Sequence, residues 1–237
     1  MSGDSVPNGR LRVAAACVLA LFGAWLGARV YLAHRAGEGG VRVPVGEASP
    51  PTASDLRDGP DPAQPPAIAI PEVLPAFALH DLAGAATPID TWRGHPLVLN
   101  FWATWCAPCR REIPLLERVG REWAGRGVTV VGIAVDHADS VADFARKLGI
   151  GYPLLVGEQD ALDVAAALGV TSPAFPFTVF TDRRARVVAL YLGELHAPQV
   201  DLILGEVARL DAGQDSLAAA RRRIEAGLKA LAPAPPG

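Results

Sequence analysis

The chain has 237 residues, of which half are hydrophobic and a fifth are charged. This composition excludes a wholly disordered chain, and the length allows one domain with a hydrophobic core plus extensions. The net charge of −3 lacks the basic excess that is typical of nucleic-acid-binding proteins, so no nucleic-acid partner is expected. Three cysteines are too few for a small fold held by several disulfides, but they can form one pair.

Residues 13–33 are almost entirely apolar, with Arg29 as the only charged residue. As a helix, this segment would measure about 31 Å, close to the thickness of the hydrocarbon core of a bilayer. A cleaved signal peptide is the alternative, but no clear cleavage site follows the segment. Arginines flank both of its ends, so their charge does not decide its orientation. The sequence predicts a short tail over residues 1–12 and a transmembrane anchor over 13–33.

Residues 34–70 are typical of a linker, because they lack apolar periodicity and are rich in proline. Nine of the 21 prolines lie between Pro44 and Pro75. At the other end of the chain, residues 213–237 are predicted to form a tail with a basic cluster at Arg221–Arg223 and no assigned chemistry, and a frayed amphipathic helix is the structure considered for it.

Between these extensions, strand patterns alternate with helix patterns. We expect a hairpin around Gly84, buried strands at 96–103, 128–135 and 154–156, and a final hairpin of 177–181 and 187–192. Helices are expected at 112–123, 140–148, 161–168 and 198–210. Pro114 should kink or weaken the first of these helices. This order predicts one α/β domain over residues 71–212, with a mixed rather than a wholly parallel sheet.

The strongest chemical signal is the sequence from Trp105 to Cys109, WCAPC, which lies between a predicted strand and a predicted helix. Two intervening residues allow both thiols to lie in one helical turn. The N-terminus of a helix favours a thiolate by up to about 2 kcal/mol. We expect Cys106 to be the exposed nucleophile and Cys109 to be the thiol that resolves the mixed disulfide.

Other interpretations of the pair stay open at this stage. A purely structural disulfide is one alternative. An inactive docking module is another, and the intact cysteines argue against it. A structural zinc site needs two more ligands, whereas the sequence has no second cysteine pair and its five histidines are scattered singly. A copper chaperone would need a third ligand, for which His137 is the candidate. No metal site is predicted.

The sequence NFWATWCAPC from Asn100 to Cys109, followed by RREIP up to Pro114, resembles the thioredoxin superfamily and most closely its TlpA/ResA-like branch. The resemblance covers residues 71–195. It implies a thioredoxin-like fold with a mixed central sheet flanked by helices, preceded here by the transmembrane helix. It also implies thiol–disulfide oxidoreductase activity that needs no cofactor beyond a redox-active disulfide between Cys106 and Cys109.

The resemblance also implies roles for other residues. Phe175 and Pro176 look like the family's cis-proline loop, which binds an extended substrate together with Trp105, and Pro176 is preferred over Pro173 as the cis residue. Ala107 and Pro108 would support the active site. Asn100 occupies the position of a buried aspartate in thioredoxins, so another carboxylate is expected to act as the general base for Cys109. Asp136 is the candidate. The alternative is that Asp136 is a solvated loop residue without a catalytic role.

The expected function is that of a single-pass protein of the bacterial inner membrane with its catalytic domain in the periplasm. It would reduce disulfides of exported proteins, with apocytochrome c or copper-site cysteines as clients suggested by the resemblance. A membrane electron donor of the disulfide-reductase relay type would then be its partner. A disulfide oxidase or isomerase that uses the same cysteine pair is the alternative.

Overall fold

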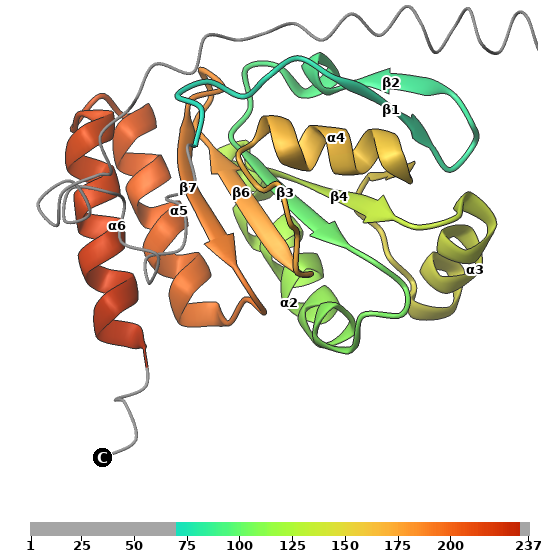
Figure 1. Ribbon diagram of the computed structural model, residues 1–237. Coiled ribbons are helices and arrows are strands. Elements are labelled where there is room, and N and C mark those ends of the chain that lie inside the picture. Colours follow the sequence, from blue (N-terminus) through green and yellow to red (C-terminus); the bar gives the residue numbers. More distant parts are fainter. Residues whose placement is uncertain (1–69, 233–237) are drawn as a thin grey trace, which may run out of the picture. The chain divides into compact units, whose positions relative to one another are not determined.

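The computed structural model describes residues 70–232, which form a seven-stranded sheet with helices on both faces (Figure 1). The strand order is β2-β1-β5-β4-β3-β6-β7. The central strand β3 (Leu97–Trp102) pairs in parallel with β4 (Thr129–Val135) and antiparallel with β6 (Phe177–Thr181). The sheet is therefore mixed, and the predicted thioredoxin-like α/β architecture is confirmed.

The remaining strands complete the two edges of the sheet. Strand β5 (Leu154–Gly157) pairs in parallel with β4, and β7 (Val187–Leu192) pairs antiparallel with β6. The hairpin of β1 (Ala78–Asp81) and β2 (Ala86–Pro88) pairs with the other side of β5 and continues into the short 3-10 helix η1 (Ile89–Trp92). All predicted strands are present, and the bounds of β6 and β7 are those expected.

Alternation along β3 divides the core between the two faces of the sheet. Val98, Asn100 and Trp102 face one layer of helices, whereas Leu99 and Phe101 belong to the second apolar cluster, on the opposite face. The first layer contains α2 (Ala107–Trp123), α3 (Ala138–Leu148), α5 (Ala197–Asp211) and α6 (Leu217–Leu231), and α4 (Gln159–Ala167) covers the second cluster.

Helix α2 begins five residues earlier than predicted. Cys106 caps it and Pro108 lies in its first turn, where the missing N–H of proline costs no hydrogen bond. The helix continues through Pro114 to Trp123, where the 3-10 turn η2 (Ala124–Arg126) follows. The early start places both cysteines at the helix N-terminus.

The prediction that the domain ends at residue 212 is wrong, because α6 packs against α5 and β7. Its Ala220 and Ile224 are buried in the main core cluster. The Arg223 guanidinium donates to both carboxylate oxygens of Glu206 on α5, with Nε 3.0 Å from each. Arg221 donates through Nε to the carbonyl of Val187, at 3.1 Å. Two of the three arginines in the predicted basic cluster therefore bind the domain itself.

The predicted transmembrane anchor and nearly all of the predicted linker lie outside the described residues. Within residues 70–232, no helix combines the length and the hydrophobicity that crossing a bilayer requires.

Replacing Ile224 with Ala should test whether α6 belongs to the folded domain. Ile224 is 3% exposed, and truncating a buried isoleucine leaves a cavity that typically costs about 2–5 kcal/mol. We expect that loss in the free energy of unfolding of the full-length protein, measured by urea denaturation. The control is Glu225→Ala at the exposed neighbouring position, which should cost less than about 0.5 kcal/mol. Equal stability of the two variants would contradict the packing of α6.

Candidate active site

The two cysteines of the motif form a disulfide at the N-terminus of α2. Cys106 is the cap residue, and the backbone N–H of Cys109 points at its Sγ, with N and Sγ 3.3 Å apart. An N–H aimed at a sulfur, together with the positive end of the helix dipole, stabilises a thiolate on Cys106 after reduction. The expectation of an exposed Cys106 needs correction: 5% of its surface is accessible, against none for Cys109.

Aromatic side chains stand beside the disulfide. Trp105 is 70% exposed, and its ring meets that of Phe175 edge to face with the centroids 6.0 Å apart. This contact brings the loop before β6 to the cysteine motif. The bond between Phe175 and Pro176 is the only cis peptide bond among residues 70–232, so the choice of Pro176 over Pro173 is confirmed. The structure thus brings Phe175, the residue before the cis Pro176, to Trp105, the residue before Cys106.

A buried acid lies one helical turn beyond Cys109. Glu112 is 1% exposed, and the i, i+3 spacing places it on the same face of α2 as the fully buried Cys109. One carboxylate oxygen accepts a hydrogen bond from Asn100 Nδ2 at 2.7 Å, and the other accepts one from the backbone N–H of Leu195 at 2.7 Å. Asn100 Nδ2 also donates to the hydroxyl of Thr178 at 3.0 Å.

Burial raises the pKa of Glu112 to about 7, and the negative charge of Glu194 adds to that effect. The hydrogen bonds from Leu195 and Asn100 act in the opposite direction, because they stabilise the ionised form. A carboxyl group with this pKa can both accept and release a proton near neutral pH. Glu112 was predicted only as the first residue of a helix and was not among the predicted site residues. Its spacing from Cys109 was the available signal.

Asp136 lies at the end of β4, beside the segment that leads into the motif. Its carboxylate accepts hydrogen bonds from the backbone N–H of Thr104 at 3.0 Å and from that of His137 at 2.8 Å, and it also accepts one from the Thr104 hydroxyl. Partial burial would raise the pKa of Asp136, but these hydrogen bonds outweigh it and hold the pKa below its ordinary value. At neutral pH Asp136 is ionised, and it fixes the backbone two residues before Cys106.

The side chain considered as a third metal ligand is engaged elsewhere. His137 Nδ1 lies 3.0 Å from a carboxylate oxygen of Glu158. Over residues 70–232, no three His, Cys, Asp or Glu side chains gather into a cluster that could hold a metal ion.

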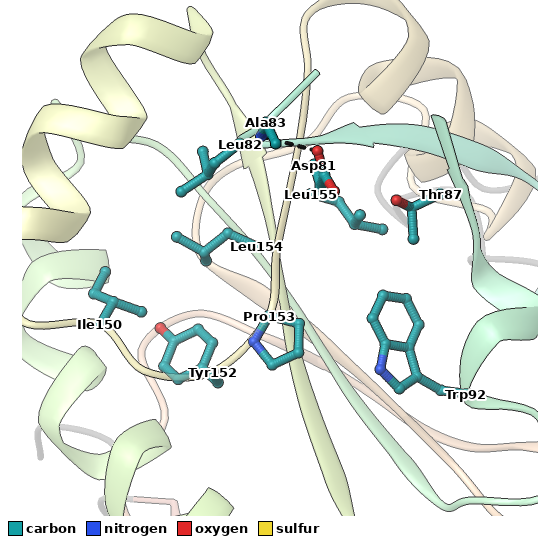
Figure 2. Close-up of a pocket in the computed structure, with 10 residues that line it drawn as sticks. All are labelled: Asp81, Leu82, Ala83, Thr87, Trp92, Ile150, Tyr152, Pro153, Leu154 and Leu155. Carbon is teal, nitrogen blue, oxygen red and sulfur yellow. Dashed lines mark hydrogen bonds between the residues drawn. The ribbon is translucent and has the colours of Figure 1, made fainter. Parts of the chain in front are cut away.

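A cavity of about 380 Å³ lies elsewhere in the molecule, where the β1–β2 hairpin meets the segment before β5. Trp92, Tyr152 and Pro153 line it, and Asp81 turns back to accept a hydrogen bond from the Ala83 N–H (Figure 2). None of its lining residues belongs to the cysteine motif or the cis-proline loop. The assignment of the active site therefore rests on the disulfide and not on this cavity.

Comparison with known proteins agrees with this geometry. The sequence model of the AhpC/TSA family matches residues 70–191. The thiol–disulfide oxidoreductase ResA of Geobacillus thermodenitrificans is 30% identical over 130 residues, which cover 54% of this chain and 72% of the relative. ResA of Geobacillus kaustophilus is 29% identical over 136 residues, covering 57% and 76%.

Solved structures give the same result. A secreted thiol–disulfide isomerase from Corynebacterium glutamicum is 28% identical, with a TM-score of 0.51, and the match covers 57% of this chain and 84% of that one. A putative protein disulfide isomerase from Bacteroides thetaiotaomicron has a TM-score of 0.54 at 23% identity, covering 63% and 97%, and shows the shared fold. The chain belongs to the AhpC/TSA family of thioredoxin-like proteins and is a thiol–disulfide oxidoreductase similar to ResA.

Proposed function

We propose that this protein reduces disulfides of exported proteins, using Cys106 as the nucleophile and Cys109 as the resolving thiol. The observation that carries exchange through these two cysteines is the buried Glu112 one turn from Cys109, beneath a disulfide at a helix N-terminus. The proline directly before the second cysteine resembles the reducing members of the superfamily rather than the strong oxidants.

The reaction begins from the reduced dithiol. The Cys106 thiolate attacks one sulfur of the client disulfide, and the other client sulfur leaves as a thiolate that takes a proton from water. The Cys109 thiol then gives its proton to the carboxylate of Glu112, and the resulting thiolate attacks Sγ of Cys106. The second client sulfur leaves and is protonated. Two electrons pass to the client, and the Cys106–Cys109 disulfide is restored.

Glu112 fits the role of proton acceptor better than Asp136. Cys109 is fully buried, so its proton needs an acceptor inside the protein, and Glu112 lies on the same helix face. Asp136 has its carboxylate occupied by Thr104 and His137 and a lowered pKa, which suits a fixed anion. We assign Asp136 the role of positioning the backbone that leads to Cys106.

The client would bind at the exposed ring of Trp105 and at the loop of Phe175 and Pro176, next to Cys106. We place the reaction in the periplasm, with residues 13–33 as the anchor in the inner membrane and a membrane protein as the source of electrons. Apocytochrome c and copper-site cysteines are the proposed clients. These assignments rest on the apolar segment and on the family resemblance.

Isomerase or oxidase activity is the second candidate function. The relative from Corynebacterium glutamicum is described as a secreted thiol–disulfide isomerase, and it shares 28% of its aligned residues with this chain. The same cysteines would then exchange or donate disulfides, so the two candidates differ in the direction of electron flow and not in the site.

The reduction potential decides between the two directions. The full-length protein in detergent is equilibrated with dithiothreitol or glutathione buffers, and its free thiols are trapped and counted. For a reductant we expect a value near that of thioredoxin, about −270 mV, or lower. A value near −120 mV, that of a dedicated oxidant, would overturn the proposed direction.

Replacing each cysteine separately with serine should reveal the role of each. With Cys109→Ser, the mixed disulfide between Cys106 and a disulfide-containing client cannot be resolved, so we expect it to accumulate on non-reducing gels. With Cys106→Ser, little adduct should form because Cys109 is fully buried. Faster adduct formation by the second variant would reverse the assignment.

Ionisation of Glu112 should make the oxidised protein less stable as the pH rises. Its pKa is about 7 when folded and about 4.5 when unfolded, so the stabilisation is complete below pH 4.5 and is lost by the time the pH has passed 7. The loss is about 3 kcal/mol. Urea denaturation from pH 4 to 8 should show this decline, and Glu112→Gln should abolish most of it. Asp136→Asn serves as the control, which should retain the decline. A decline of equal size in Glu112→Gln would show that another group causes it.

A further inference from the structure

Three consecutive residues between β7 and α5 each bind a different part of the active site. The N–H of Gly193 donates to the carbonyl of Pro176 at 2.9 Å. The carboxylate of Glu194 accepts from the Arg111 guanidinium, with Nε 3.0 Å from each oxygen. The N–H of Leu195 donates to Glu112 at 2.7 Å. The segment 193–195 therefore joins the substrate loop, the surface of α2 and the buried acid.

The two ends of this segment are held by the fold. Gly193 has φ +98°, a conformation that favours glycine, and this allows the chain to turn as it leaves β7. The side chain of Leu195 is 1% exposed and belongs to the main core cluster. Between them, Glu194 reaches outward, and its contact with Arg111 is the side-chain bond that ties the middle of the segment to α2.

Neighbouring residues on α2 bind neighbouring residues of the segment. Arg111 is 62% exposed and Glu194 is 19% exposed, whereas Glu112 is buried. The hydrogen bonds from Arg111 hold the pKa of Glu194 below its ordinary value, so this pair stays ionised across the neutral range. The ion pair of Arg111 and Glu194 is therefore adjacent, on both α2 and the segment 193–195, to the buried hydrogen bond between Glu112 and Leu195.

We propose that Arg111 and Glu194 are positioning residues for thiol–disulfide exchange: their ion pair holds the segment 193–195 so that the Leu195 N–H stays on the carboxylate of Glu112. The inference rests on the proposed role of Glu112 as the proton acceptor of Cys109. Neither residue is assigned contact with the substrate or the reacting sulfurs.

For Glu194→Ala, a purely electrostatic effect on Glu112 and a positioning effect predict opposite shifts in the pH at which Cys109 becomes reactive. Glu194 is the charged side chain that acts on the pKa of Glu112, and Arg111, the residue before Glu112 on α2, is paired with Glu194. The thiol of Cys109 would add a negative charge once it ionises, whereas burial keeps Tyr152 neutral by raising its pKa. Removing the negative charge of Glu194 favours ionisation of Glu112. Losing the hydrogen bond from Leu195 disfavours it.

Positioning therefore predicts that Arg111→Ala and Glu194→Ala both raise the pH at which Cys109 becomes reactive, although they remove opposite charges. Exposed ion pairs contribute little free energy, so we expect resolution below the midpoint to slow by roughly two- to fivefold in each variant. If only charge mattered, Arg111→Ala would raise that pH and Glu194→Ala would lower it.

The measurement uses the reduced full-length protein in detergent and 5,5′-dithiobis(2-nitrobenzoic acid), with Cys17→Ser in every variant so that Cys106 and Cys109 are the two thiols left in the sequence. The first thionitrobenzoate is released as Cys106 reacts, and the second is released as Cys109 resolves the mixed disulfide. The rate of the second release is followed from pH 5 to 9 by stopped flow. Arg118→Ala is the matched control, since it removes a cation from α2 that, among residues 70–232, pairs with Glu122 alone. Amide exchange of Leu195, measured by NMR, should be faster in both test variants.

The Glu112→Gln variant distinguishes a failure of the proposed role of Glu112 from a failure of the positioning role of Arg111 and Glu194. If this variant keeps the wild-type midpoint, the proposed role of Glu112 is wrong. If it abolishes the midpoint while Glu194→Ala shifts it to lower pH or leaves it unchanged, the positioning role is wrong. Upward shifts in both test variants, with no shift in Arg118→Ala, are the result expected.

Discussion

The burial of one carboxyl group is the constraint on which the rest of the site depends. Glu112 is removed from water on the helix that also carries both cysteines, and a buried acid is tolerated only when its oxygens have partners. Those partners come from distant parts of the chain, Asn100 on β3 and the backbone of Leu195 after β7. Strand β3, helix α2 and the segment 193–195 must all be in place before this acid can be accommodated.

In the resulting site, two carboxylates have two different roles. Asp136 is held ionised by Thr104 and His137, and it orders the backbone before Cys106. Glu112 is held near the point where its two protonation states are equally populated at neutral pH. Their environments, and not their residue types, make one a structural anion and the other a proton carrier.

The sequence was informative where one local pattern determined the outcome. The apolar runs located the buried strands, and the turn at Gly84 located the first hairpin. The WCAPC motif and Phe175-Pro176 located the disulfide and the cis bond. Glu112 was missed because only tertiary contacts reveal that its helix face is buried. Helix α6 was placed outside the domain because its buried stripe is short and consists partly of alanine, as at Ala220, so composition gave little signal. Its attachment depends on partners on other elements, such as Glu206 on α5 and the carbonyl of Val187 on β7.

Helix α6 also changes what the active site rests on. The loop that donates to Glu112 runs directly into α5, and α6 covers α5 through Ile224 and Arg223. A fold that ended at α5 would leave one side of that helix exposed to water. The loop at its start would then be held less firmly. Here α6 lies beside α5 in the same layer, packs on β7 as well, and covers that side of α5. We therefore expect proton transfer at the sulfurs to depend on the packing between α5 and α6, so that substitutions in α6 alter redox behaviour without touching a reactive group.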